Sequence, residues 1–177
     1  PYQPDGVWQK VGGTNYKYVV SPGEKKYRRG LYVLIKRGAP YPSFINFDAN
    51  ERMTCRVERN RSNTPLQALT LMNDPAYVEA AMSFAKRVII DRPEAGISDR
   101  IKYAFQIAVT RDPKQRESTA LQSLFREQLK AGNADAMAAK EFIGKFEKPK
   151  STNDAEFVAW YAVAAALLNL DETITKG

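Results

Sequence analysis

Three helix-start signals follow one another from Thr64 onward, and they constrain the fold of this chain more than any other feature. Thr64-Pro65 and Asp74-Pro75 each place a capping side chain directly before a proline, and Asp112-Pro113 repeats the pattern. Proline fits the first turn of a helix because its missing N–H has no partner there anyway. Gln67, three residues after Thr64, completes a capping box. A separate helix is therefore predicted to begin at each signal.

Between these signals, apolar side chains recur at helical spacing, which predicts buried stripes on successive helices. We expect Gly132 to terminate one of them as the residue just past its end. The stripe after residue 154 covers so much of its helix that this helix is expected to be central. The stripes are Val78, Ala81, Phe84, Ala85 and Val88; Ile97, Ile101, Ala104, Phe105 and Ala108; Leu121, Leu124, Phe125 and Leu129; and Phe157, Val158, Trp160, Tyr161, Ala164, Leu167 and Leu168.

The region before Thr64 is less regular. Residues 1–23 are rich in Gly, Pro and aromatic side chains and predict an extended lead-in with one short strand. Tyr27, Leu31, Leu34 and Ile35 then fall at helical spacing, which predicts a helix with its basic residues on the opposite face. Residues 39–63 follow neither period and predict a long ordered, arginine-rich loop, because their phenylalanines give the loop something to bury.

The fold predicted from these patterns is mainly α. We expect a single compact domain over 1–177 with about six or seven helices. Its parts would be an extended lead-in over 1–23, a basic helix and long loop over 24–63, and a helical core over 64–177. We expect the chain to be the C-terminal fragment of a larger protein. No apolar run reaches the length of a membrane span.

Positive charge is concentrated between Lys25 and Arg61. Ten basic residues stand there against three acidic ones, an excess of +7 that equals the net charge of the whole chain. The remainder is therefore electrically balanced. A block of this kind favours a polyanionic partner.

Residue types exclude most catalytic chemistry. The chain has no histidine and one cysteine, Cys55. Nucleophile–histidine pairs, histidine-ligated zinc, haem attachment through Cys-x-x-Cys-His and an intrachain disulfide are thus excluded. No catalytic or metal-ligating residue is predicted, and no cofactor is expected in this fragment. Asp48 and Glu51 are a poor candidate for a glycosidase pair, because neighbouring arginines would lower their pKa values and spoil a general acid.

The candidate site is an anion-binding set within the basic stretch. Arginine side chains bind carboxylate, sulfate or phosphate with two parallel hydrogen bonds. An alternative stays open, in which the same arginines hold the loop together by bonding backbone carbonyls and pairing with Asp48 and its acidic neighbours. The predicted residues are Arg28, Arg29, Lys36, Arg37, Asp48, Arg52, Arg56, Arg59, Arg61 and Asn63.

Several strings resemble one family of proteins. They are Arg28-Arg29-Gly30-Leu31-Tyr32, Lys36 to Ser43, Phe47-Asp48-Ala49, Asn63 to Leu69 with Asn73-Asp74-Pro75, Arg111-Asp112-Pro113, and Leu167 to Glu172. Together they are similar to the planctomycete cytochrome-associated C-terminal domain of unknown function, of the PSD-one type. The likeness covers nearly the whole chain and is densest from Arg28 to Pro75.

The resemblance implies an exported bacterial parent, in the periplasm or at the cell surface, often with a cytochrome c domain upstream. Any haem is thus expected in other parts of the parent. The family has no established activity. Tyr41 stands where members commonly have histidine, and Leu34-Ile35 where an aromatic pair is usual.

Three functions remain open from the sequence. The first is a non-catalytic binding or assembly domain, docking an acidic protein, a glycan or upstream domains of the parent through Lys25–Arg61. The second is part of an enzyme on anionic polysaccharides, with catalytic groups supplied from upstream. The third is a nucleic-acid-binding module, which the charge allows but which no recognition motif supports.

Overall fold

The computed structural model describes residues 2, 6, 8, 18–36, 38–49, 57 and 62–175. All regular structure in these ranges is helical, which confirms the mainly α prediction. Residues 18–20 form no strand, and most of the predicted extended lead-in lies outside the described residues. The chain divides into two compact units, Pro1–Ala76 and Tyr77–Gly177. The predicted count of one domain stays a prediction.

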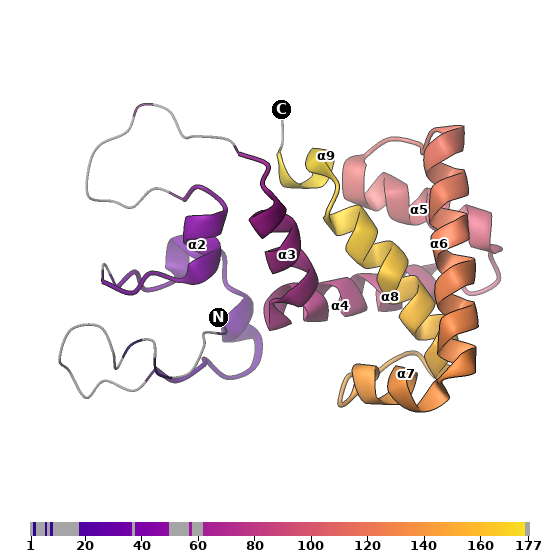
Figure 1. Ribbon diagram of the computed structural model, residues 1–177, viewed down its shortest axis with the longest axis horizontal. Helices are drawn as coiled ribbons and strands as arrows, with labels where there is room; N and C mark the ends of the chain where they lie inside the picture. The colour runs from indigo at the N-terminus through magenta and orange to yellow at the C-terminus, as the bar shows by residue number, and fades with distance from the viewer. Residues whose placement is uncertain are drawn as a thin grey trace. The chain divides into compact units, whose positions relative to one another are not determined.

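The first unit contains two short 3-10 helices, η1 (Gly23–Tyr27) and η2 (Gly30–Tyr32), and two α-helices, α2 (Pro42–Asn46) and α3 (Pro65–Asn73) (Figure 1). The start of α3 matches the sequence pattern. The Gln67 backbone N–H donates to Thr64 Oγ1 at 3.3 Å, and the Thr64 N–H donates to Gln67 Oε1 at 3.1 Å. The predicted capping box is therefore confirmed, with Pro65 in the first turn.

The helix predicted around Tyr27 to Ile35 is wrong. The backbone is extended at Arg28 and Arg29, with ψ angles of 143° and 146°, so η1 and η2 remain separate single turns. Gly30 explains part of the difference. A Cβ atom on it would lie 2.8 Å from Cε1 of the Phe44 ring, so the chain at this point follows a tertiary contact that helical spacing does not reveal.

The second unit is built on the helices α4 (Pro75–Asp91), α5 (Ile97–Val109), α6 (Gln115–Ala134), α7 (Ala136–Ile143), α8 (Asp154–Leu168) and α9 (Asp171–Ile174). α4 begins at Pro75, before the boundary between the units. The described residues thus hold eight α-helices against about six or seven expected. The short helix α2 lies within residues 39–63, which were predicted to be an irregular loop, and no pattern predicted α9 as a separate helix.

Helix α8 is the centre of the second unit, as its apolar circumference predicts. It packs against α5, α6, α7 and α9 (Figure 1). Phe157 and Leu167 are fully buried, and the Trp160 ring lies 4.6 Å from that of Phe125 on α6. Burial of such side chains contributes roughly 1.5–3 kcal/mol each, which makes this cluster the main source of stability for the unit.

Gly132 does not end a helix, contrary to prediction. It lies inside α6, which continues to Ala134, and it is buried. A Cβ at this position would lie 3.0 Å from both the Cα and the Cβ of Ala155 on α8. Glycine is therefore required here for the close approach of two helices rather than for a left-handed turn.

Candidate functional site

Five of the ten predicted anion-binding residues are placed by the structure: Arg28, Arg29, Lys36, Asp48 and Asn63. The other five lie outside the described residues: Arg37, Arg52, Arg56, Arg59 and Arg61. All five described ones belong to the Pro1–Ala76 unit. Within that unit they have different surroundings.

Arg28 and Arg29 form the extended link between η1 and η2, and both are exposed, as is Lys25 within η1. Among the residues that the structure describes, no carboxylate lies within ion-pair distance of these three cations. Their charge is thus available to a partner.

Lys26 and Lys36, by contrast, are used within the unit. The Lys36 Nζ donates to the Trp8 carbonyl at 3.1 Å and lies 5.1 Å from the centre of the Trp8 ring. The Lys26 Nζ donates to the Tyr2 hydroxyl at 2.8 Å and lies 4.7 Å from the Tyr27 ring centre. A cation over an aromatic face contributes about 0.5–1 kcal/mol at exposed sites. These two lysines anchor the basic segment to the aromatic side chains that precede it.

Asp48 closes the base of the 49–61 segment. It adopts a left-handed backbone conformation with φ of 54°, which is uncommon for residues other than glycine but which aspartate adopts more readily than most. Its Oδ2 accepts from the Ser62 backbone N–H at 2.9 Å and from the Ser62 hydroxyl at 2.5 Å. The chain therefore returns to its starting point across these bonds.

Gln67 completes the same closure from α3. Its side chain is 1% exposed, and its Nε2 donates to the Asn46 carbonyl at 2.7 Å and to Ser62 Oγ at 2.9 Å. A parallel bond, from Asn46 Nδ2 to Thr70 Oγ1 at 2.9 Å, joins α2 to α3. A buried amide with all these partners satisfied rigidifies its surroundings. Asp48, Ser62 and Gln67 form what we call the loop-base lock. Asn63, beside it, is exposed.

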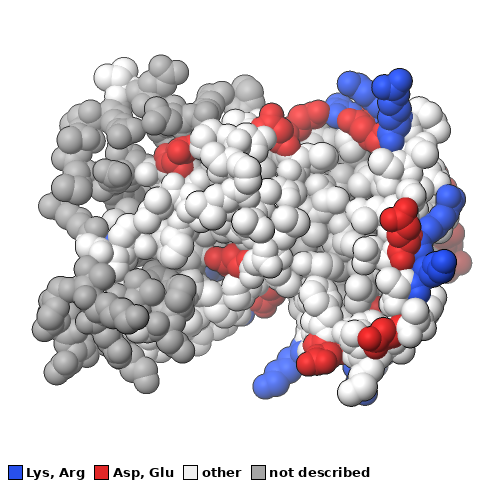
Figure 2. Space-filling view, viewed as in Figure 1, with Lys and Arg blue, Asp and Glu red and all other residues white. Residues whose placement is uncertain are grey.

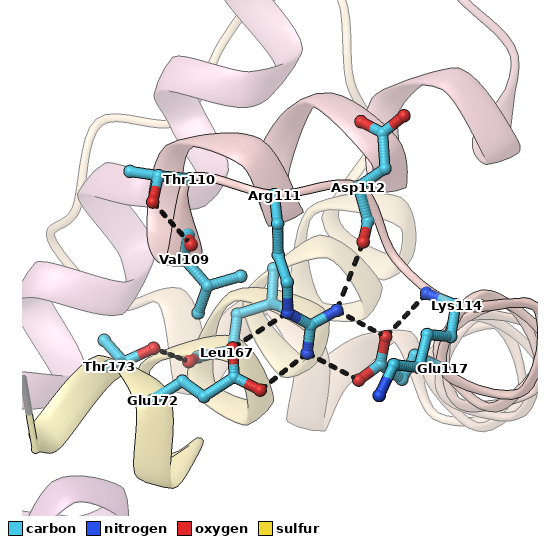
Figure 3. Close-up of polar contacts among 9 residues, drawn as sticks. All are labelled: Val109, Thr110, Arg111, Asp112, Lys114, Glu117, Leu167, Glu172 and Thr173. Carbon is cyan, nitrogen blue, oxygen red and sulfur yellow. Dashed lines mark hydrogen bonds and ion pairs between the residues drawn. The ribbon is translucent and has the colours of Figure 1, made fainter. Parts of the chain in front are cut away.

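Arg111 lies at a second polar centre, in the Tyr77–Gly177 unit (Figure 3). Its Nε and Nη2 donate to Glu172 on α9 at 2.9 and 2.6 Å. Its Nη1 and Nη2 donate to Glu117 on α6 at 2.9 and 2.8 Å, and Nη1 also donates to the Asp112 carbonyl at 3.1 Å. These five bonds match the five N–H donors of a guanidinium. We call Arg111, Glu117 and Glu172 together the Arg111 clamp. It links α6 to α9 and leaves no guanidinium N–H free to bind a ligand.

Nothing in the sequence around Glu172 indicates a partner for its carboxylate. The contact joins residues 61 positions apart, and no periodicity predicts it. Glu172 is half exposed yet bonded on both oxygens. The only local signal was the position of Arg111 just before Asp112-Pro113, where a helix was predicted to begin; α6 begins instead at Gln115, with Lys114 as its N-cap.

The clamp changes the titration of its members. The hydrogen bonds from Arg111 and from the Lys114 backbone N–H lower the pKa of Glu117 to about 2. The hydrogen bonds from Arg111 also lower the pKa of Glu172. The pKa of Arg111 itself is raised because it donates to both carboxylates. All three groups are therefore charged across the neutral range.

Replacing Glu117 with glutamine should destabilise the protein in a pH-dependent way. The folded pKa of about 2 lies below the ordinary value of roughly 4.3, so the ionised carboxylate stabilises the fold fully above that ordinary value. This contribution is lost as the pH falls toward 2. Melting curves of wild type and Glu117→Gln should differ by several degrees in Tm at pH 6–7, and the difference should shrink below about pH 4.5. Glu127→Gln, on the exposed side of α6, should change Tm little at any pH. A wild-type advantage that persists unchanged to pH 2.5 would contradict the assignment.

Some other charges of the second unit also form ion pairs. Arg100 bonds Glu156 at 3.3 Å and Lys102 bonds Asp112 at 2.9 Å. Figure 2 shows acidic and basic side chains interspersed along the side on which α5 and α6 lie. This pattern matches the electrical balance of the sequence outside the basic stretch.

Within the described ranges, no three His, Cys, Asp or Glu side chains gather closely enough to hold a metal ion. Cys55 lies outside those ranges. No described helix is long and apolar enough to cross a bilayer.

Comparison with known proteins places this chain within one family. The model of the family described as PSD1, Protein of unknown function (DUF1553), matches residues 1–125. No curated protein matches the chain. No solved structure matches it either.

Proposed function

The chain belongs to the PSD1 family of proteins of unknown function, and from this premise we propose that it is a non-catalytic docking domain that binds an anionic partner through Lys25–Arg61. The family description names no activity, so the proposal rests on the chemistry of the residues. It fits a chain without histidine, whose described residues bring together no metal-binding cluster.

One observation carries the proposal. Lys25, Arg28 and Arg29 are exposed and have no carboxylate in ion-pair distance among the described residues. The excess positive charge of the chain therefore lies in this segment, whereas basic and acidic residues balance one another in number over the rest of the chain. A concentrated positive field attracts an anionic partner and speeds its association.

The proposed setting follows the resemblance noted in the sequence. The parent would be an exported, cytochrome-associated bacterial protein in the periplasm or at the cell surface. The anionic partner would be an acidic protein, an acidic glycan or an upstream part of the same parent. Under this proposal the domain itself needs no cofactor, and haem belongs to other parts of the parent.

Thermal shift at low salt tests the proposal with three additives: an acidic c-type cytochrome, a sulfated oligosaccharide and a short DNA. A ligand at a hundred times its Kd should add about 2.7 kcal/mol to the stability of the folded protein. Arg28→Gln with Arg29→Gln should weaken binding about tenfold, or about 1.4 kcal/mol. The matched control is Arg116→Gln with Lys130→Gln, which removes the same charge from exposed positions on α6. No shift with any additive, or equal loss in both double variants, would refute docking through the basic stretch.

A further inference from the structure

The exposed cations share their segment with exposed apolar side chains. Tyr27 is 50% exposed, Leu31 69%, Tyr32 61% and Leu34 67%, and neither η1 nor η2 contains a buried residue. A folded protein exposes single apolar side chains freely, but several large ones gathered in one short segment favour an interaction surface. We call Lys25, Tyr27, Arg28, Arg29, Leu31, Tyr32 and Leu34 together the basic–apolar strip.

The strip is held in place while its apolar side chains stay exposed. Lys26 ties its start to the Tyr2 hydroxyl, and Lys36 ties the residues after its end to the Trp8 carbonyl. Between them, Gly30 lies against the Phe44 ring, close enough that a Cβ atom would collide with it. These contacts fix the backbone without covering Leu31 or Leu34. A surface held in one conformation loses little conformational entropy when it binds.

The mixture of side chains discriminates between classes of partner. Sulfated sugars and nucleic acids would satisfy Arg28 and Arg29 but would leave the two leucines in water. A base stacks on tyrosine but not on leucine. A protein surface with carboxylates around an apolar centre satisfies both parts of the strip. Tyrosine and arginine are also the residues that carry binding energy at protein interfaces.

We infer that the anionic partner is a protein, and that Leu31, Tyr32 and Leu34 enter an apolar depression in it while its acidic side chains pair with Lys25, Arg28 and Arg29. The inference rests on the proposed docking function and names the class of its partner. Charge complementarity fixes the sign of the partner surface, and the exposed leucines require its apolar centre.

Two labelled peptides of equal negative charge test this inference on the full chain by fluorescence anisotropy. One contains glutamate, serine and glycine, and the other has leucine and phenylalanine in place of the serines. A heparin-derived oligosaccharide is the third probe. We expect the apolar acidic peptide to bind at least tenfold more tightly than the polar one. Leu31→Ser with Leu34→Ser should abolish that factor and leave binding of the polar peptide unchanged.

The control is Val19→Ser, an apolar-to-polar change at a side chain that is 75% exposed and outside the strip. It should preserve the tenfold factor. Because both leucines are exposed, the double serine variant should keep the circular dichroism spectrum of wild type. The comparison of the two peptides can also be made on the wild-type protein alone.

The binding results that would contradict the docking function differ from those that would contradict the protein partner. If no probe binds, the docking function fails and the inference fails with it. If the polar peptide and the oligosaccharide bind as tightly as the apolar peptide, anion docking stands and the protein partner is overturned. The protein partner is likewise overturned if the serine variant keeps the full preference for the apolar peptide.

Discussion

Replacing Gly132 with valine should lower the free energy of unfolding of the Tyr77–Gly177 unit by about 3 kcal/mol. The new Cβ would start 3.0 Å from the Cα and Cβ of Ala155, and the two methyl groups would need still more room. Because the contact atoms belong to the α8 backbone and its first side-chain atom, they have no rotamer through which to move away. Urea unfolding, with hydrogen exchange of the α8 amides as the local readout, measures the loss.

Ala131→Val is the matched control for this change. It introduces the same side chain at the preceding, exposed position of α6. Only the lower helix propensity of valine should matter there, about 0.6 kcal/mol. Equal losses in the two variants would show that α6 and α8 do not depend on a glycine contact.

The second large effect is expected from Gln67→Leu, which should destabilise the Pro1–Ala76 unit by about 3 kcal/mol. Leucine fills a similar volume but leaves the Thr64 N–H and the Asn46 carbonyl without their partners and removes a donor to Ser62. Each unsatisfied buried group costs about 1–3 kcal/mol, partly offset by the apolar side chain. Exchange of the α3 amides should accelerate accordingly.

Gln115→Leu makes the same chemical change at an exposed position of α6 and should alter stability by less than about 0.5 kcal/mol. Thr70→Val offers an intermediate case, because it removes the bond from Asn46 and the bond that the Thr70 hydroxyl donates to the Leu66 carbonyl. If Gln67→Leu proved as mild as the exposed change, the amide would have no role in holding the loop base.

Local signals in the sequence were the most reliable predictors of the fold. Thr64-Pro65 with Gln67 and Asp74-Pro75 specify helix starts through contacts within one turn, and the structure confirms both starts. The central place of α8 was also predictable, because a helix apolar around its whole circumference has to be surrounded by others.

The predictions of local structure were wrong where a contact with a residue distant in sequence determines the conformation. Glycine often follows the end of a helix, which is why Gly132 was predicted there. It is needed instead for the close contact of α6 with Ala155, which comes later in the chain. Tyr27, Leu31 and Leu34 have helical spacing, but Gly30 follows its contact with Phe44 instead. Helical spacing reflects only contacts between residues close together in sequence, so it predicts neither of these two contacts.

The sequence predicted the positive charge of the candidate site but not how its residues are arranged. The sequence located the excess of positive charge, and the structure leaves Arg28 and Arg29 exposed in an extended link. It did not separate these arginines from Lys36, which bonds to the Trp8 carbonyl. Nor did it identify the exposed leucines as part of the surface, because their spacing suggested burial. Anion binding by the set stays a prediction.

The loop-base lock joins the residues on either side of the segment between Asp48 and Ser62. Asp48 and Ser62 meet through bonds of 2.9 and 2.5 Å, so both ends of the segment are fixed to each other by groups outside it. Each doubling in the length of such a loop costs only about 0.6 kcal/mol of closure entropy. Lengthening the chain between these two residues should therefore cost the helices α2 and α3 little stability.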